Sequence, residues 1–352
     1  MERIERVREI LEENQAALIF TPVSSIYLSG FQSSLGYLFI TKEKAVLFVD
    51  GRYIEAAKNK ANNKIEVRLF TKLSEQVKDF LGDGVKTLLV ETTNTVADVR
   101  GFERLFEREI RPSEELESAL HTLRLIKTDY EIDCIVKAQR MAEKAFDDIL
   151  NFIREGVTET QIAAELEYRM KLAGSETVSF ETIAVSGEKT SMPHGVPSDK
   201  VVKAGDFITM DFGAVYKGYH SDMTRTVAVG YATDEMQRVY DTVLRANLAA
   251  IDTVKEGATA AEVDLAARNI IKNEGYGQYF THSTGHGVGL EIHEAPTVSF
   301  KNEKNLLSGQ VITVEPGVYL EGRFGVRTED MVVVTKNGCN NLTNASKSLI
   351  II

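Results

Sequence analysis

The sequence predicts two domains: an α/β domain over residues 1–124, and an α+β domain over residues 125–352 with an internal repeat. Three observations support this prediction. A chain of 352 residues is longer than one hydrophobic core usually organises. The apolar runs of the first third alternate between helix-like and strand-like periods. Several motifs of the second part occur twice, which predicts two similar halves related by a pseudo-twofold axis.

The first domain alternates predicted helices and strands. Its elements are an amphipathic helix at 2–14, strands at 17–21, 37–41, 45–49 and 86–91, a turn at 50–53 that leads into a helix, and a helix from Val96. The strands at 37–41 and 45–49 form a predicted hairpin. A long helix with a 3.6-residue apolar period begins near Thr128, so we place the domain boundary after residue 124.

Composition excludes several classes of protein. The net charge is −11 and no basic cluster occurs, which argues against nucleic-acid binding. No run approaches 18 apolar residues, so we expect no membrane span, and the N-terminus lacks the pattern of a signal peptide. The two cysteines, Cys134 and Cys339, have neither metal-ligand spacing nor disulfide density. These features are typical of a cytoplasmic protein.

The repeat places four carboxylates at matching positions. Two seven-residue segments align with each other, and each ends an apolar strand in a carboxylate, Asp211 or Glu315. A second pair, Asp222 and Glu329, leads the β-branched strand that follows. A single such carboxylate is usually a helix cap or an ion-pair partner, for example of Arg225. Four in one cleft repel each other unless divalent cations neutralise them, so we predict a metal site between the halves.

His286 supplies a nitrogen ligand in this prediction, because its flanking glycines allow close backbone approach. Oxygen-rich sites with one imidazole suit Mn²⁺, Co²⁺, Fe²⁺ or Zn²⁺. Two such ions roughly 3.5–4 Å apart can activate a water and polarise a carbonyl together. Glu315 would also relay the proton.

Three further histidines are candidates for contacts with a substrate. A lone histidine beside a turn is usually structural, but His194 and His293 lie near the metal set in sequence. We therefore favour roles in binding the substrate or protonating its leaving amine. The pair 194–195 is interpreted as the repeat counterpart of 286–287. His282 is expected to line the pocket.

These residues resemble the "pita-bread" metallopeptidases, which include methionine aminopeptidase, aminopeptidase P and prolidase. The resemblance rests on the strings MDFGAVYKGYHSDMTRT, HSTGHGVGLEIHEAP, TVEPGVY and VRTEDMVVV, and it spans most of residues 126–352. It implies five ligands for two divalent ions, Mn²⁺ or Co²⁺ first and Zn²⁺ or Fe²⁺ as alternatives. The implied ligands are Asp211, Asp222, His286, Glu315 and Glu329. Creatinase shares this fold without the ligand set.

The first domain separates the subfamilies. A methionine aminopeptidase needs little more than the second domain, whereas a preceding α/β domain with a DGRY turn resembles aminopeptidase P and prolidase. The resemblance implies a homodimer that hydrolyses proline-containing peptides after the N-terminal residue, by attack of a metal-activated water. His194, His293 and Glu315 would be catalytic, and His282 and Arg327 would bind substrate.

One position departs from the prolidase pattern. Several prolidases carry an arginine four residues after the histidine that matches His293, where this chain has Thr297. That arginine can clamp the carboxylate of a dipeptide. Its replacement favours an aminopeptidase P that also cleaves longer peptides. Arg327 matches a substrate-site arginine, or it supports Glu329. Two alternatives stay open: an aminopeptidase of other specificity, and a non-catalytic binding module, which would be expected to have lost ligands.

Overall fold

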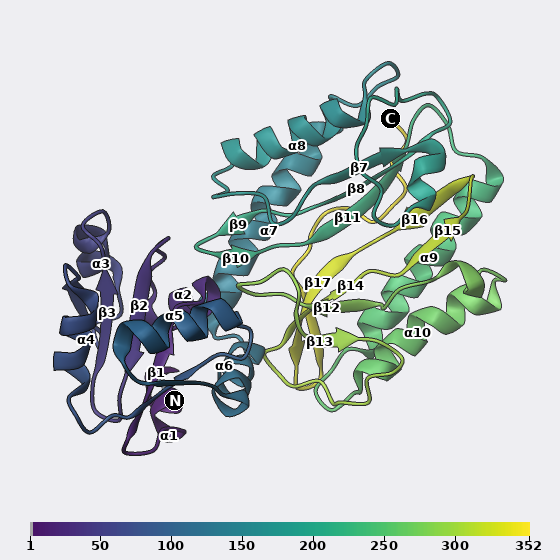
Figure 1. Ribbon diagram of the computed structural model, residues 1–352. Coiled ribbons are helices and arrows are strands. Elements are labelled where there is room, and N and C mark those ends of the chain that lie inside the picture. The colour runs from purple at the N-terminus through teal and green to yellow at the C-terminus, as the bar shows by residue number, and fades with distance from the viewer. Residues whose placement is uncertain (1–2) are drawn as a thin grey trace. The chain divides into compact units, whose positions relative to one another are not determined.

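The computed structural model describes residues 3–352, and the chain divides into two compact units, Met1–Arg124 and Leu125–Ile352 (Figure 1). The first unit is an α/β structure, as predicted. Its six strands form one mixed sheet in the order β4 (Glu66–Leu69), β3 (Ala45–Val49), β2 (Gly36–Ile40), β1 (Gln15–Ile19), β5 (Thr87–Val90), β6 (Glu109–Pro112). Its helices are α1 (Arg3–Glu9), α2 (Pro22–Ser29), α3 (Ile54–Lys60), α4 (Leu73–Leu81), α5 (Val96–Phe106) and α6 (Glu114–Leu125).

The predicted hairpin is confirmed: β2 and β3 pair antiparallel, with Ile40 opposite Ala45. The first helix is shorter than predicted, because α1 ends at Glu9 rather than near residue 14. The chain turns before β1, where the backbone N–H of Gln15 donates to the carbonyl of Glu12. The sheet pairing of β1 therefore overrides the helical pattern of the residues before it.

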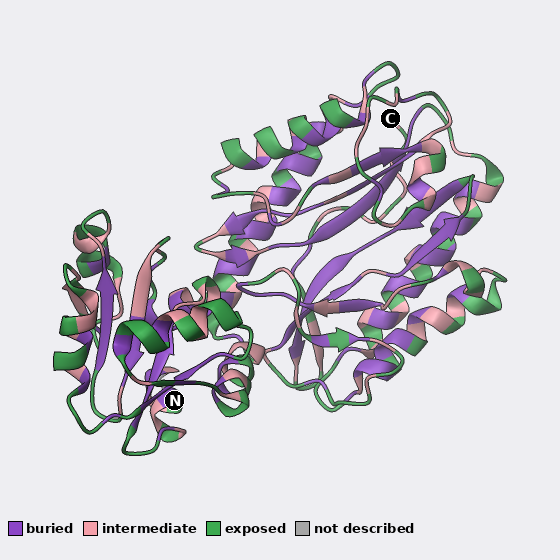
Figure 2. Cartoon of the chain, viewed as in Figure 1, coloured by how far each residue is buried: buried purple, intermediate pink, exposed green. Residues whose placement is uncertain are grey.

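The second unit consists of two similar halves. The first half contains α7 (Asp129–Ile149), α8 (Glu159–Leu172) and the antiparallel sheet β11 (Met223–Ala228), β8 (Phe207–Phe212), β7 (Ile183–Ser186). The second half contains α9 (Asp234–Thr253), α10 (Ala260–Asn273) and the sheet β13 (Glu294–Val298), β12 (Gly285–Gly287), β14 (Val311–Val314), β17 (Asp330–Thr335), β18 (Gly338–Asn341). Shorter elements are η1 (Gly187–Ser191), β9 (Val215–Tyr216), β10 (Tyr219–His220), η2 (Gly277–Tyr279), β15 (Gly317–Leu320) and β16 (Phe324–Arg327). Figure 2 shows β8, β11, β14 and β17 buried and the outer faces of the helices exposed.

The two halves repeat each other in detail. Thr158 and Thr259 both cap their helices in capping boxes, as predicted from their spacing. Each capped turn also forms an isolated β-bridge, Thr158 to Val201 and Thr259 to Asn305. Each half has its own hydrophobic core, in which the two helices pack on the half's own sheet. This pseudo-symmetry brings the ends of the central strands together.

The structure corrects one detail of the predicted repeat. His286 lies in β12, next to Gly287, which pairs with Ile312 of β14. The corresponding strand of the first half is β7, whose Ser186 pairs with Ile208. The residue equivalent to His286 is therefore Val185, and His194 belongs to the loop after η1 instead.

Among residues 3–352, no helix combines the length and apolar character that crossing a bilayer requires.

Candidate metal centre and active site

A cavity of about 770 Å³ lies within the second unit. All nine residues predicted for the site line its wall, although they come from seven separate segments of the chain. They are Asp211, Asp222, Glu315, Glu329, His194, His282, His286, His293 and Arg327. The tertiary structure thus gathers every predicted site residue around one space.

Strand pairing positions the carboxylates. Asp211 is the next-to-last residue of β8 and lies opposite Thr224 of β11. Asp222 directly precedes β11, and Glu329 directly precedes β17. The hydroxyl of Thr224 donates to Oε2 of Glu329 at 2.7 Å, which links the two halves. Glu315 follows β14, and its backbone N–H donates to the carbonyl of Thr284.

His286 faces these carboxylates from β12. Its Nε2 lies 3.5 Å from Oδ2 of Asp222 and 3.5 Å from Oε1 of Glu315. Both distances exceed those of strong charge-assisted hydrogen bonds. A Cβ atom on Gly285 would lie 2.0 Å from the carbonyl oxygen of Thr313, so only glycine allows β12 to approach β14 this closely.

The donor set fits a divalent cation. One ligand atom from each of Asp222, His286 and Glu329 lies within 4.8 Å of the other two. Oδ1 of Asp211 is buried and has no hydrogen-bond partner among the described residues. A buried carboxylate oxygen without a partner is costly in a protein interior, and a bound cation would satisfy it.

The electrostatics of the ion-free site favour neutral forms. Burial, and then the neighbouring carboxylates, raise the pKa values of Asp222 and Glu329 well above their usual range. Burial also raises the pKa of Glu315 to about 8. For His286, burial lowers the pKa to about 4, so the imidazole is neutral at pH 7. Its Nδ1 donates to the carbonyl of Gly287, which leaves the Nε2 lone pair available as a ligand.

A chain of hydrogen bonds connects Asp211 to His282. Arg327 donates from Nη2 to Oδ2 of Asp211 at 2.5 Å, and from Nη1 to the hydroxyl of Tyr319 at 2.8 Å. Tyr319 in turn lies 2.8 Å from Nε2 of His282. Nδ1 of the neutral His282 donates to the carbonyl of Ser283 at 2.8 Å, so its Nε2 accepts the hydrogen bond from the Tyr319 hydroxyl. Arg327 therefore contacts Asp211 directly, and it reaches Glu329 only through the hydroxyl of Thr224, to which its Nε donates at 3.0 Å.

Sequence reasoning missed Tyr319 and Thr224 as parts of this site. Both lie within strings that carried the resemblance, but neither residue type alone indicates chemistry. Tyr319 is buried on β15, where burial raises its pKa to about 12. Their role became visible only through the hydrogen bonds that they make to Arg327 and Glu329.

His194 and His293 lie on the exposed part of the cavity wall. The ring centroid of His293 is 4.3 Å from that of His286. His293 precedes β13, and its neighbour Glu294 forms a buried ion pair with Lys127 at 3.0 Å. Both histidines are thus within reach of a molecule in the cavity without being held by the protein core.

Comparisons with known proteins agree with this geometry. Residues 133–336 match metallopeptidase family M24. The chain belongs to this family. Residues 3–126 match the creatinase/prolidase N-terminal domain. The predicted pita-bread fold with its preceding α/β domain is thereby confirmed, as is the assignment of the chain as a metallopeptidase, a family that implies divalent metal ions.

Relatives cover this member of the M24 family from end to end. It is 40% identical to a Xaa-Pro dipeptidase of Pyrococcus horikoshii, over 99% of both chains. The solved Xaa-Pro dipeptidase of Bacillus anthracis has 41% identity and a TM-score of 0.93, over 100% of this chain and 99% of that one. The X-Pro aminopeptidase of Thermotoga maritima has 38% identity and a TM-score of 0.91, over 98% and 99%.

Proposed function

We propose that this metallopeptidase hydrolyses the peptide bond between an N-terminal residue and a following proline. The observation that carries the proposal is the convergence of four carboxylates and one neutral imidazole on a single cavity. The proposal is also supported by relatives that are about 40% identical to this chain over its full length and are named Xaa-Pro dipeptidase or X-Pro aminopeptidase. We also propose that residues 1–124 form an N-terminal domain and residues 125–352 the catalytic domain.

Five residues would hold two divalent ions. Mn²⁺ and Co²⁺ are the preferred candidates, and Zn²⁺ and Fe²⁺ are the alternatives. Asp211 and Asp222 would hold one ion, His286 and Glu315 the other, and Glu329 would be shared. When bound, the ions supply the Lewis acidity that activates a water and polarises the scissile carbonyl.

The protein's own groups perform the remaining chemistry. Glu315 accepts the proton of the attacking water. His194 and His293 stabilise the tetrahedral intermediate, and one of them protonates the leaving amine of proline. Their exposed position on the wall leaves them free to follow the substrate. His282 and Arg327, which are linked through Tyr319, orient the substrate.

The length of the substrate distinguishes a dipeptidase from an aminopeptidase. Thr297 lines the cavity at the position where several prolidases carry an arginine. Without that clamp, a peptide longer than two residues loses no carboxylate contact relative to a dipeptide. We therefore propose cleavage of both. We also propose a cytoplasmic homodimer, in keeping with the composition of the chain and the resemblance to aminopeptidase P and prolidase.

The test is turnover by metal-stripped protein that has been reloaded with Mn²⁺ or Co²⁺. Three peptides discriminate the activities: Ala-Pro, Ala-Pro-Ala and Met-Ala-Ser. Cleavage of both proline peptides is expected. Cleavage of Ala-Pro alone would make the protein a strict dipeptidase, and release of Met alone would overturn the proposal in favour of a methionine aminopeptidase.

A further inference from the structure

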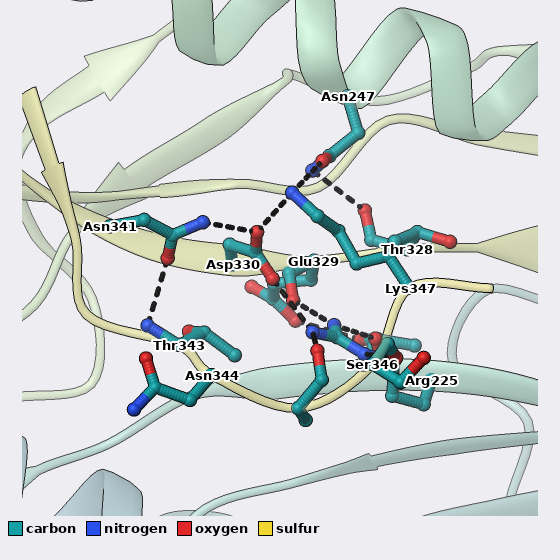
Figure 3. Close-up of polar contacts among 12 residues, drawn as sticks. Arg225, Asn247, Thr328, Glu329, Asp330, Asn341, Thr343, Asn344, Ser346 and Lys347 are labelled. Carbon is teal, nitrogen blue, oxygen red and sulfur yellow. Dashed lines mark hydrogen bonds and ion pairs between the residues drawn. The ribbon is translucent and has the colours of Figure 1, made fainter.

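A second set of polar side chains lies beside Glu329, and its members do not line the cavity (Figure 3). Its first member is Asn247 of α9, which is fully buried. Nδ2 of Asn247 donates to the carbonyl of Val314 at 2.8 Å and to that of Thr328 at 3.3 Å. These two residues directly precede Glu315 and Glu329. One amide group thus holds the backbone beside two predicted metal ligands.

The second member is Arg225 of β11, which is 1% exposed. Each of its five N–H groups has an acceptor. The acceptors are the carbonyls of Thr224 (2.9 Å), Glu329 (2.5 Å), Ala345 (2.8 Å) and Ser346 (2.9 Å), and Oδ1 of Asp330 (2.8 Å). Arg225 therefore ties the backbone of Glu329 to the C-terminal segment, which we define as residues 344–352.

Lys347 of the C-terminal segment connects the two members. Its Nζ donates to Oδ2 of Asp330 at 2.6 Å and to Oδ1 of Asn247 at 3.1 Å. Lysine only donates, so Oδ1 of Asn247 must accept. This contact fixes the orientation of the amide and points Nδ2 at the two carbonyls. Figure 3 shows Lys347 between Asp330 and Asn247.

The C-terminal segment is also bound to the last residue of β11 and to α9. The backbone N–H of Ala228 donates to the carbonyl of Ile350, and that of Ile352 donates to the carbonyl of Ala228. The hydroxyl of Tyr240 donates to the carbonyl of Lys347 at 3.0 Å. Because Asp222 directly precedes β11, the segment stabilises the strand that presents this ligand as well.

We propose that these side chains form a positioning network that sets the geometry of the metal ligands, and that docking of the C-terminal segment completes it. The network consists of Arg225, Asn247, Asp330 and Lys347. The proposal rests on the proposed function, in which Glu315 and Glu329 bind ions. Groups that orient ligands through hydrogen bonds commonly change metal affinity or activity 10- to 100-fold when they are removed. A buried polar set is otherwise a poor source of stability, since apolar residues of similar volume often serve as well.

Two variants test the network in the full-length protein. Asn247→Asp keeps the shape and the acceptor for Lys347, but it replaces the donor that faces the two carbonyls. Lys347→Met removes the cation from a partly exposed position, so folding should be retained. The exposed lysine variant Lys336→Met is the matched control. Mn²⁺ affinity and stoichiometry are measured by titration of metal-stripped protein, together with kcat, KM and Tm.

Both variants should bind Mn²⁺ about 10- to 100-fold more weakly than the wild type. Their kcat should fall at limiting Mn²⁺ while KM stays within twofold, because no side chain of the network lines the cavity. Lys347→Arg, which keeps the cation, should restore much of the affinity. A lower Tm with unchanged Mn²⁺ affinity in both variants would reduce the network to a structural role and overturn the proposal. Failure of the wild type itself to bind divalent ions would instead overturn the proposed function.

Discussion

Arg327 and Asp211 form a buried ion pair, with 2.5 Å between Nη2 and Oδ2. The pair occupies one oxygen of Asp211 and leaves Oδ1 without a hydrogen-bond partner among residues 3–352. It therefore balances part of the negative charge of the site while one oxygen stays available to a cation. Arg327 makes this contact and the contact to Tyr319 from the same guanidinium. Charge balance and ligand orientation thus depend on one side chain.

Replacement of Arg327 should damage catalysis more than folding. Arg327→Met removes the partner of Asp211, and small displacements of a reacting group can cost about 100-fold in rate. We expect kcat/KM for Ala-Pro-Ala to fall by about that factor. Arg327→Lys should recover little, because lysine cannot reproduce the planar fork. The control is Arg323→Met, which removes an exposed arginine paired with Glu235. Equal activity of Arg327→Met and the control would contradict the role.

Metal loading should release protons. Burial raises the pKa of Glu315 to about 8, so its carboxyl is largely protonated at pH 7 in the ion-free protein. A ligand must be deprotonated to bind the ion, and each binding event therefore sets the proton free. Calorimetry in buffers of different ionisation enthalpy measures the number released. Glu315→Gln should release fewer protons and should lose turnover while remaining folded. Identical heats in all buffers would refute this expectation.

The stability of the ion-free protein should fall on mild acidification, in part through His282. Burial, and then the charge of Arg327, lower the pKa of His282 from 6.5 to about 4. Between these pH values the unfolded state binds the proton and the folded state does not. This contribution to the free energy of unfolding is complete above pH 6.5 and is lost as the pH falls toward 4.

Denaturant titrations at pH 7 and pH 5 measure this effect. His282→Gln should show a smaller pH dependence of the free energy of unfolding than the wild type. The exposed histidine variant His121→Gln should behave like the wild type. A pH dependence that is unchanged in His282→Gln would exclude His282 as the source.

Thr297 offers a test of substrate length. Thr297→Arg places a guanidinium on the cavity wall, where it can bind the carboxylate of a dipeptide. We expect kcat/KM for Ala-Pro to rise about tenfold relative to Ala-Pro-Ala, which corresponds to about 1.4 kcal/mol. Thr297→Gln provides a side chain of comparable reach without the charge, and it should leave the ratio unchanged. A similar change in both variants would point to size rather than charge.

The duplicated helix caps should contribute similarly to stability. Thr158 and Thr259 each accept a hydrogen bond from the backbone N–H three residues later. Replacement of either threonine by alanine should cost about 1 kcal/mol, as is usual for a lost N-cap. Thermal denaturation measures the loss, and the corresponding serine variants, which keep the hydroxyl, should retain most of the stability. A loss in only one half would show that the two caps are not equivalent.

Much of the site could be predicted from the sequence because its signals are local. Each signal is a short pattern of neighbouring residues. The patterns are a carboxylate after an apolar strand, a histidine between glycines, and a threonine three residues before Gln or Glu. The repeat then indicated that Asp211, Asp222, Glu315 and Glu329 would meet. The structure places all four on one cavity.

Other features depended on partners far apart in the chain. Periodicity cannot show that His194 leaves the repeat for a loop while Val185 takes the position equivalent to His286, because strand register is set by pairing. Likewise, Tyr319 became part of the site only through Arg327 and His282.

By itself, the sequence determined the two-domain organisation, the duplicated halves and the identity of the candidate ligands, since each depends on the order and type of nearby residues. Only the tertiary structure decided which groups lie behind those ligands. Arg225 and Lys347 are separated by about a third of the chain, yet both bind the carboxylate of Asp330, and Lys347 also binds Asn247. Hydrogen bonds form over about 3 Å whatever the sequence separation, so contacts of this kind exist only once the chain has folded.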